Sequence, residues 1–272
     1  MKKIWFVALA LIILQACGSN DNQFTIEGEL KNADNQKLYL IELKTDGISK
    51  IDSVTLGQEG TFAFKGYTST PKFFMVRTDQ RNSVTLIVEP NDEIALNGNA
   101  ENLSENYTVE GSEGSKKIME LRERLSSTIT RLDSLGKIYR ENKDKEAAGA
   151  LRSRLNQASQ EIVNEQKEYT KSFIDDNISS LASLMALYQQ IGPRRYVLNP
   201  KEDFRYFERV DSALMAEYPN SGPVKSLHSQ VEKLRDRMEA DRKSKQRLAL
   251  GNKAPEIALA NPEGDTVRLS SL

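Results

Sequence analysis

The residue types that most often carry chemistry are scarce in this sequence. Its 272 residues contain one cysteine, Cys17, and one histidine, His228. A zinc or iron site that needs several Cys and His ligands therefore cannot be assembled from them, and neither can an internal disulfide or a pair of redox cysteines. We predict no catalytic, cofactor-binding or metal-binding residue in this chain, and no bound cofactor.

Cys17 ends an N-terminal segment that has the features of a secretion signal. Lys2 and Lys3 precede an unbroken apolar run at residues 4–14, which is too short to span a bilayer but suits the core of a signal peptide. The run leads into the sequence LQAC at residues 14–17, which resembles the lipobox of bacterial lipoproteins. That resemblance implies removal of residues 1–16 and lipidation of Cys17. The alternative is an ordinary secretion signal with a cysteine at this position by chance.

Lipidation of Cys17 would decide where the protein resides. Several acyl chains on one residue exceed what stable anchoring requires, so we expect an envelope protein held on the outer or inner membrane and facing the periplasm. Residues 17–23 would form a short polar tether. Loss of Lys2 and Lys3 leaves 36 basic and 39 acidic residues. Lipidation also consumes the one thiol, which excludes thiol catalysis by these residues.

The overall charge excludes one class of partner. The formal net charge of the whole chain is -1, although 28% of its residues are charged. Without a basic excess the chain has no means of competing for phosphates, so we predict no nucleic-acid binding. The length allows one large domain or two modest ones.

Residues 24–111 show the period-two alternation of β-strands. Short runs rich in Val, Ile, Thr, Tyr and Phe are separated by turn residues such as Asp46-Gly47 and Glu59-Gly60. No helical pattern interrupts them, which predicts an antiparallel β-sandwich or barrel. The aromatic side chains of this region could line a groove, but their alternation assigns them to the core: Phe62, Phe64, Tyr67, Phe73 and Phe74.

Residues 112–248 show the helical period instead. Two long apolar stripes, at residues 118–135 and 151–173, step by three and four, and the charged segment 141–149 lies between them. This pattern predicts an antiparallel helical hairpin with coiled-coil packing. Further helices are expected at residues 178–191, from an N-cap at Asn199 to Tyr218, and at residues 224–248.

Two features of the helical region could be sites. His228 has no second histidine, cysteine or other catalytic partner near it in the sequence, so we interpret it as a surface or capping residue. Arg194 and Arg195 could hold an anion, or they could lie in a solvated loop. We assign no site to either feature.

The last segment, residues 249–272, predicts a β-hairpin. Ile257 and Leu259 alternate on one side of a Pro-Glu-Gly-Asp turn, and Val267 and Leu269 alternate on the other. The pattern G-x-x-A-P-x-I-x-L, then a turn with glycine, then V-x-L-S-x-L resembles the opening of thioredoxin-like domains of the TlpA/ResA and AhpC/TSA group. The order lipobox, β-rich domain, helical spacer and this motif resembles the lipid-anchored thiol:disulfide oxidoreductases of Bacteroidetes-type bacteria.

The resemblance implies an α+β multidomain chain whose redox domain is cut short before its W-C-x-x-C motif. No catalytic residue can be carried over from the family, so it remains open whether this chain is enzymatic. We expect an anchoring and accessory portion of a thiol:disulfide oxidoreductase, with periplasmic redox proteins or substrate proteins as partners. The alternative is a complete, non-enzymatic envelope lipoprotein whose β-sandwich is a binding module.

Overall fold

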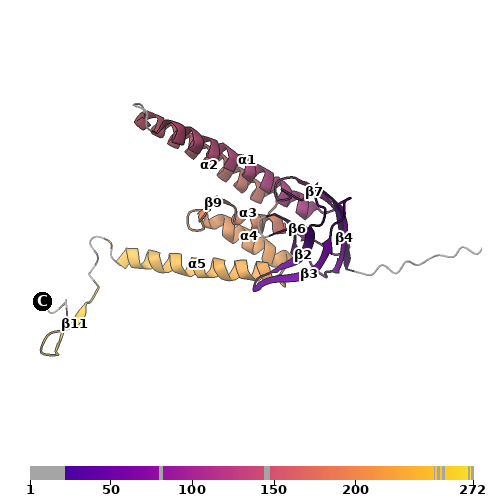
Figure 1. The fold of residues 1–272 in the computed structure, drawn as a ribbon. Helices are drawn as coiled ribbons and strands as arrows, with labels where there is room; N and C mark the ends of the chain where they lie inside the picture. The colour runs from indigo at the N-terminus through magenta and orange to yellow at the C-terminus, as the bar shows by residue number, and fades with distance from the viewer. Residues whose placement is uncertain are drawn as a thin grey trace, which may run out of the picture.

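A computed structural model of the chain describes residues 22–79, 82–143, 148–247, 249, 252, 255–268 and 270. The predicted lipidation site, Cys17, lies outside these residues. The described part is an α+β structure in which two β-sheets come first, a group of helices follows, and a short hairpin lies at the C-terminal end (Figure 1).

The period-two segment forms two four-stranded sheets that do not close into a barrel. Sheet A has the order β4-β1-β7-β8, and sheet B has the order β3-β2-β5-β6. The strands are β1 (Gln23–Lys31), β2 (Lys37–Lys44), β3 (Gly47–Thr55), β4 (Thr61–Tyr67), β5 (Lys72–Arg77), β6 (Ser83–Val88), β7 (Glu93–Asn99) and β8 (Tyr107–Glu110).

The prediction of a purely antiparallel sandwich is wrong at one position. β1 and β7 run parallel, with Ile26 opposite Ile94 and Leu30 opposite Gly98, whereas the other ladders of both sheets are antiparallel. Alternation within a strand reports which face is buried but carries no information about strand order or direction. The sequence pattern therefore could not reveal this pairing.

Sheets A and B enclose one apolar core. The rings of Phe24 on β1 and Phe74 on β5 lie 4.9 Å apart between centroids, so residues from the two sheets meet directly. Phe62 and Phe64 are buried in the same core, as the alternation predicted, whereas Tyr67 at the end of β4 is 62% exposed. The two stacked sheets therefore form a sandwich.

The opposite face of sheet B is covered by helices. Phe73 and Phe74 are neighbours on β5, so their side chains point to opposite faces of sheet B. Phe73, with Ile87 of β6, belongs to a second apolar core made mainly of helical residues. Because sheet B contributes side chains to both cores, it is the middle layer between sheet A and the helices (Figure 1).

The first helix, α1 (Glu113–Asn142), is attached to sheet B at its N-terminus. The N-cap Ser112 accepts a hydrogen bond from the Ser115 amide at 3.2 Å and donates one to the Ile87 carbonyl at 2.8 Å. Ser115 donates to the same carbonyl and accepts from the Ile87 amide. A Cβ at Gly114 would lie 2.9 Å from the Ile87 side chain, so this approach requires glycine.

The predicted helical hairpin is present as α1 and α2 (Ala148–Asp176). Four buried polar side chains join the hairpin to the rest of the helical region. The Thr128 hydroxyl donates to the Gln166 amide oxygen at 2.7 Å, and Thr170 donates to the Gln189 amide oxygen at 3.1 Å. Gln189 in turn donates to the Leu121 carbonyl at 3.0 Å. Beyond Thr128 no residue of α1 is buried, and the paired helices extend away from the sandwich (Figure 1).

Two helix boundaries in the next segment differ from those predicted. α3 covers only Leu181–Leu187, and its continuation forms a small antiparallel pair, β9 (Gln190–Gly192) and β10 (Arg195–Tyr196). The N-cap of α4 (Phe204–Glu217) is Asp203 rather than Asn199. Asn199 instead accepts a hydrogen bond from the Lys201 amide at 2.9 Å, so it stabilises the turn before the helix.

The last helix and the terminal hairpin follow the predicted order. α5 covers Gly222–Arg247, and its buried residues Val224, Leu227 and Val231 all lie in its first half. β11 (Ala258–Ala260) pairs with β12 (Thr266–Arg268) in antiparallel register, with Leu259 opposite Val267. Every residue of these two strands is exposed.

Candidate functional site

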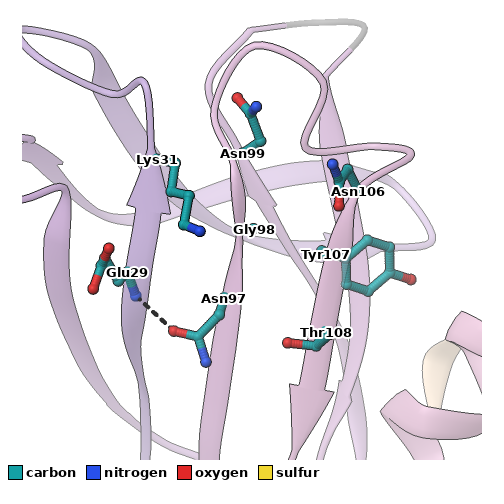
Figure 2. A pocket seen from close by; sticks show the side chains of 8 residues that line it. All are labelled: Glu29, Lys31, Asn97, Gly98, Asn99, Asn106, Tyr107 and Thr108. Carbon is teal, nitrogen blue, oxygen red and sulfur yellow. Dashed lines mark hydrogen bonds between the residues drawn. The ribbon is translucent and has the colours of Figure 1, made fainter.

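The outer face of sheet A carries a polar hollow of about 360 Å³ (Figure 2). It crosses β1, β7 and β8, three neighbouring strands of that sheet. We refer to it as the sheet A hollow, and its lining residues are Glu29, Lys31, Asn97, Gly98, Asn99, Asn106, Tyr107 and Thr108.

The alternation of the strands places these polar side chains together. Residues two apart on a strand share a face, so Glu29 and Lys31 on β1 project beside Asn97 and Asn99 on β7 (Figure 2). Gly98 between them lies where a Cβ would approach the Asn106 carbonyl oxygen to 2.7 Å. A side chain at that position would therefore push β7 away from the start of β8.

Asn97 fills a break in the parallel ladder between β1 and β7. The paired positions stop at Glu27 and resume at Leu30, and between them the Glu29 amide donates to the Asn97 side-chain oxygen at 3.0 Å (Figure 2). The amide oxygen of Asn97 thus takes the place of a backbone carbonyl as the acceptor. The Asn97 amide nitrogen has no partner among the described residues.

Two opposite charges line the sheet A hollow without forming an ion pair. Neither Glu29 nor Lys31 has an ion-pair partner among the residues that the structure describes. With the amides and the Thr108 hydroxyl they offer a ligand several hydrogen-bond donors and acceptors of both kinds. Polar groups of this type favour a ligand rich in hydroxyl or amide groups.

Tyr107 on β8 adjoins the sheet A hollow, but its side chain belongs to the apolar core between the two sheets. The residue is 9% exposed, and its hydroxyl is buried with no hydrogen-bond partner in the structure. Burial raises the pKa of this phenol to about 12. Because the hydroxyl is neutral, buried and directed away from the hollow (Figure 2), Tyr107 cannot serve there as an acid or a base.

The sequence did not predict this site. In the sequence Glu27, Glu29, Asp52 and Asp92 are scattered along the strands, without the closely spaced oxygen ligands of a calcium loop. The described residues contain no group of three His, Cys, Asp or Glu side chains able to hold a metal ion. The outward polar positions of β1, β7 and β8 were visible in the sequence, but the order of the strands that brings them together was not.

His228 has one recorded polar partner in the structure. On α5 its Nδ1 atom lies 3.0 Å from the Asp211 carboxylate of α4. The Asp211 side chain is only 7% exposed and that of His228 is 46% exposed. Among the described residues no nucleophile is hydrogen-bonded to this histidine, so the pair ties α4 to α5 and forms no catalytic triad.

The two arginines that could hold an anion lie at the connection between β9 and β10. Arg194 has a φ of 59°, and Arg195 is the first residue of β10. The Arg195 side chain lines a hollow of about 410 Å³ on the helical hairpin, where Arg152 of α2 joins it. Arg195 therefore does not simply lie in a solvated loop, because its side chain also lines this hollow.

One comparison with known proteins matches the sandwich. Residues 24–118, about a third of the chain, match a family model described as "Domain of unknown function (DUF4369)". The match covers β1 to β8 and the start of α1, so it includes the serine contacts to Ile87. No curated protein matches this chain. Among the described residues, no helix is both long and apolar enough to cross a membrane.

A solved structure shows a weak likeness to part of the chain. It is the crystal structure of a "putative cell adhesion protein" from Bacteroides ovatus, with 14% sequence identity and a TM-score of 0.22. The alignment covers 34% of this chain and 44% of that protein. At this TM-score the likeness carries no argument about fold or function.

Proposed function

We propose that this chain is the membrane-anchored, non-catalytic accessory portion of an envelope thiol:disulfide oxidoreductase. The single observation that carries the proposal is the hairpin of β11 and β12. It lies within the segment that resembles the opening of a thioredoxin-like domain, and Leu259 pairs with Val267, as the alternation of that segment predicts.

The hairpin presents apolar side chains that need a further layer. Ile257, Leu259 and Val267 are 53%, 69% and 37% exposed. A two-stranded hairpin is marginal in water on its own, and it gains stability when more strands or a helix cover one face. A thioredoxin-like domain would supply that layer, which supports the assignment of this hairpin to such a domain.

α5 is suited to separate the hairpin from the sandwich. A helix of 26 residues is about 39 Å long. Because its buried residues lie only in the first half, the second half extends beyond the helical core (Figure 1). The proposed redox domain would thus be held away from sheet A by a rigid spacer.

The other end of the chain supports a location close to a membrane. β1 begins at Gln23, so few residues separate it from Cys17. Five extended residues reach at most about 18 Å. A lipid on Cys17 would therefore hold the sandwich within a short distance of the bilayer, with α5 leading away from it.

The codons that follow Leu272 in the gene test the redox proposal. We expect them to encode a buried strand followed by W-C-x-x-C within a few dozen residues. The extended protein should then reduce or oxidise a model disulfide, and replacement of either cysteine by serine should abolish that activity. An in-frame continuation with no cysteine pair, or a stop codon directly after Leu272, would contradict the proposal.

The anchor is tested separately through Cys17. In a bacterial host that processes lipoproteins, the full chain should fractionate with membranes and incorporate radiolabelled palmitate. The Cys17→Ser variant should incorporate none and should leave the membrane fraction. An unmodified thiol in the intact mass of the mature protein would refute lipidation without affecting the redox proposal.

The sheet A hollow favours a second candidate function, that of a binding module in a non-enzymatic envelope lipoprotein. Its exposed amides and charges suit a glycan or another hydroxyl-rich ligand. Screening the full chain on a glycan array should give signals that Lys31→Ala removes. Lys65→Ala is the matched control, because Lys65 is exposed on neighbouring β4 and does not line the hollow. Signals unchanged by Lys31→Ala would exclude this site.

A further inference from the structure

The helical hairpin contains a hollow whose chemistry differs from that of sheet A. We call it the arm pocket, and it has a volume of about 410 Å³. Its apolar floor is formed by Leu132 and Leu135 of α1 and Leu155 of α2, and Arg152 and Arg195 stand at its margin. The volume lies in the range of about 300–1,000 Å³ typical of sites for small organic ligands.

The leucines of the arm pocket are only half-buried because no third helix of the described part of the chain covers the hairpin at this level. α1 buries its last residue at Thr128, and α2 is the helix that packs along the rest of its described length. A coiled-coil seam of two helices leaves part of its apolar stripe open to water. The open part of the stripe is the floor of the pocket.

Gly136 keeps the floor of the arm pocket open. Glycine inside a helix costs about 1 kcal/mol relative to alanine, and Gly136 lies within the 30-residue helix α1. Close packing does not require a glycine at position 136, since a Cβ there would meet only the Arg140 guanidinium group, at 3.3 Å. The absence of a side chain at this position has the effect of enlarging the pocket.

Arg152 and Arg195 bring positive charge to the arm pocket from two different elements. Arg152 lies on α2, and Arg195 is placed by the turn in which Arg194 adopts the left-handed conformation with φ 59°. Neither guanidinium group has an ion pair among the described residues. Residues 129–160 also contain seven Lys and Arg against four Asp and Glu in a chain of net charge -1.

We propose that the arm pocket binds a single-chain anionic amphiphile, such as a fatty-acid carboxylate. The hydrocarbon chain would cover the half-buried leucines, and the carboxylate would lie between the two guanidinium groups, which suit planar anions. The volume fits one alkyl chain rather than a diacyl phospholipid. This inference depends on neither proposed function, since it involves other residues.

Titration calorimetry of the full chain with dodecanoate tests the proposal. We expect one bound dodecanoate per chain, and no measurable binding of acetate, which has the same head group without the chain. The double variant Arg152→Gln/Arg195→Gln should bind about tenfold more weakly, as expected for two partly exposed charged contacts. The matched control Arg154→Gln, on the same helix but outside the pocket, should bind as the parent does.

Gly136→Leu tests the cavity without changing any charge. It should abolish dodecanoate binding by filling the floor, while the far-ultraviolet circular dichroism retains the helical signal. Gly149→Ala, at another helical glycine with no atom near its Cβ, is the control for helix stabilisation alone. Binding that is equal in the parent, the double variant and Gly136→Leu would overturn the proposal. So would arginine-dependent binding to phosphatidylglycerol vesicles without binding of free dodecanoate.

Discussion

Single polar groups decide much of the local energetics in the sandwich, and Tyr107 is the clearest case. Its hydroxyl is buried without a partner, which costs about 1–3 kcal/mol relative to a satisfied or absent group. Tyr107→Phe should therefore raise the free energy of unfolding in urea by about 1 kcal/mol. Tyr188→Phe is the control, because that hydroxyl donates to Gln230 at 3.0 Å and its loss should not stabilise.

The stability gained by Tyr107→Phe should depend on pH. The pKa of Tyr107 is raised to about 12 in the fold, whereas an unfolded tyrosine ionises near pH 10. Deprotonation therefore favours the unfolded chain, and the parent loses stability as the pH rises from about 10 towards 12. The advantage of Tyr107→Phe should widen over that interval. A constant difference would mean that the phenol is hydrated in the native state.

Glu89 gives a second residue-scale prediction, in the acidic range. Burial, with the nearby Asp92 carboxylate, raises the pKa of Glu89. A raised carboxyl pKa means that the fold prefers the protonated form, so this contribution to stability is present at low pH and is lost as the pH rises. Glu89→Gln should raise the melting temperature at pH 7 and make no difference at pH 3. The exposed Glu59→Gln should have no effect at either pH.

At the scale of elements, the polar network at the base of the helical hairpin fixes how α1, α2 and the segment after α3 pack. Gln166→Ala would remove the acceptor of the Thr128 hydroxyl and a donor to Gln189, both buried. We expect a loss of about 2 kcal/mol in urea unfolding. The exposed Gln157→Ala on the same helix should change stability by less than about 0.5 kcal/mol. Equal effects of the two variants would show that the network contributes nothing specific.

Element type was predictable from the sequence where side-chain periodicity is strong. The runs FTIEGEL and SVTLIVE are β1 and β6, and the long 3.6-residue stripes are α1 and α2. The strand pair β9–β10 could not be predicted, because strands of two or three residues are too short to show an alternation of apolar and polar side chains. Asn199 has the residue type and spacing of an N-cap, and it does accept backbone hydrogen bonds from Lys201 and Glu202. Those bonds close the turn that precedes α4, whose N-cap is Asp203.

The candidate sites were beyond prediction for a different reason. Lys31, Asn97 and Thr108 share the sheet A hollow only because β1 lies beside β7 and β7 beside β8. Arg152 and Arg195 meet at the arm pocket only because β9 packs against α1 and β10 pairs with β9. Periodicity places a residue on a face of its own element, whereas these sites depend on which elements become neighbours.

At the scale of the whole molecule, sheet B joins the sandwich to the helices. Phe73→Ala would open a cavity in the second core, and changes of this kind cost about 3–5 kcal/mol. We expect the helical circular dichroism signal and the amide protection of β1 and β7 to be lost in one transition at a lower urea concentration. Ile48→Ala, at a side chain 60% exposed on β3, should leave the midpoint unchanged. Separate transitions for sheet and helices would show two independent units.

The position of β1 has a mechanical consequence. Although it is the first strand, it lies in the interior of sheet A, with β4 on one side and β7 on the other. A pull on the N-terminal end of the chain enters the structure at this strand and acts along its length. The hydrogen bonds to both neighbours would then be strained together in shear rather than opened one after another, so the strand should withstand force far better than one at the sheet edge.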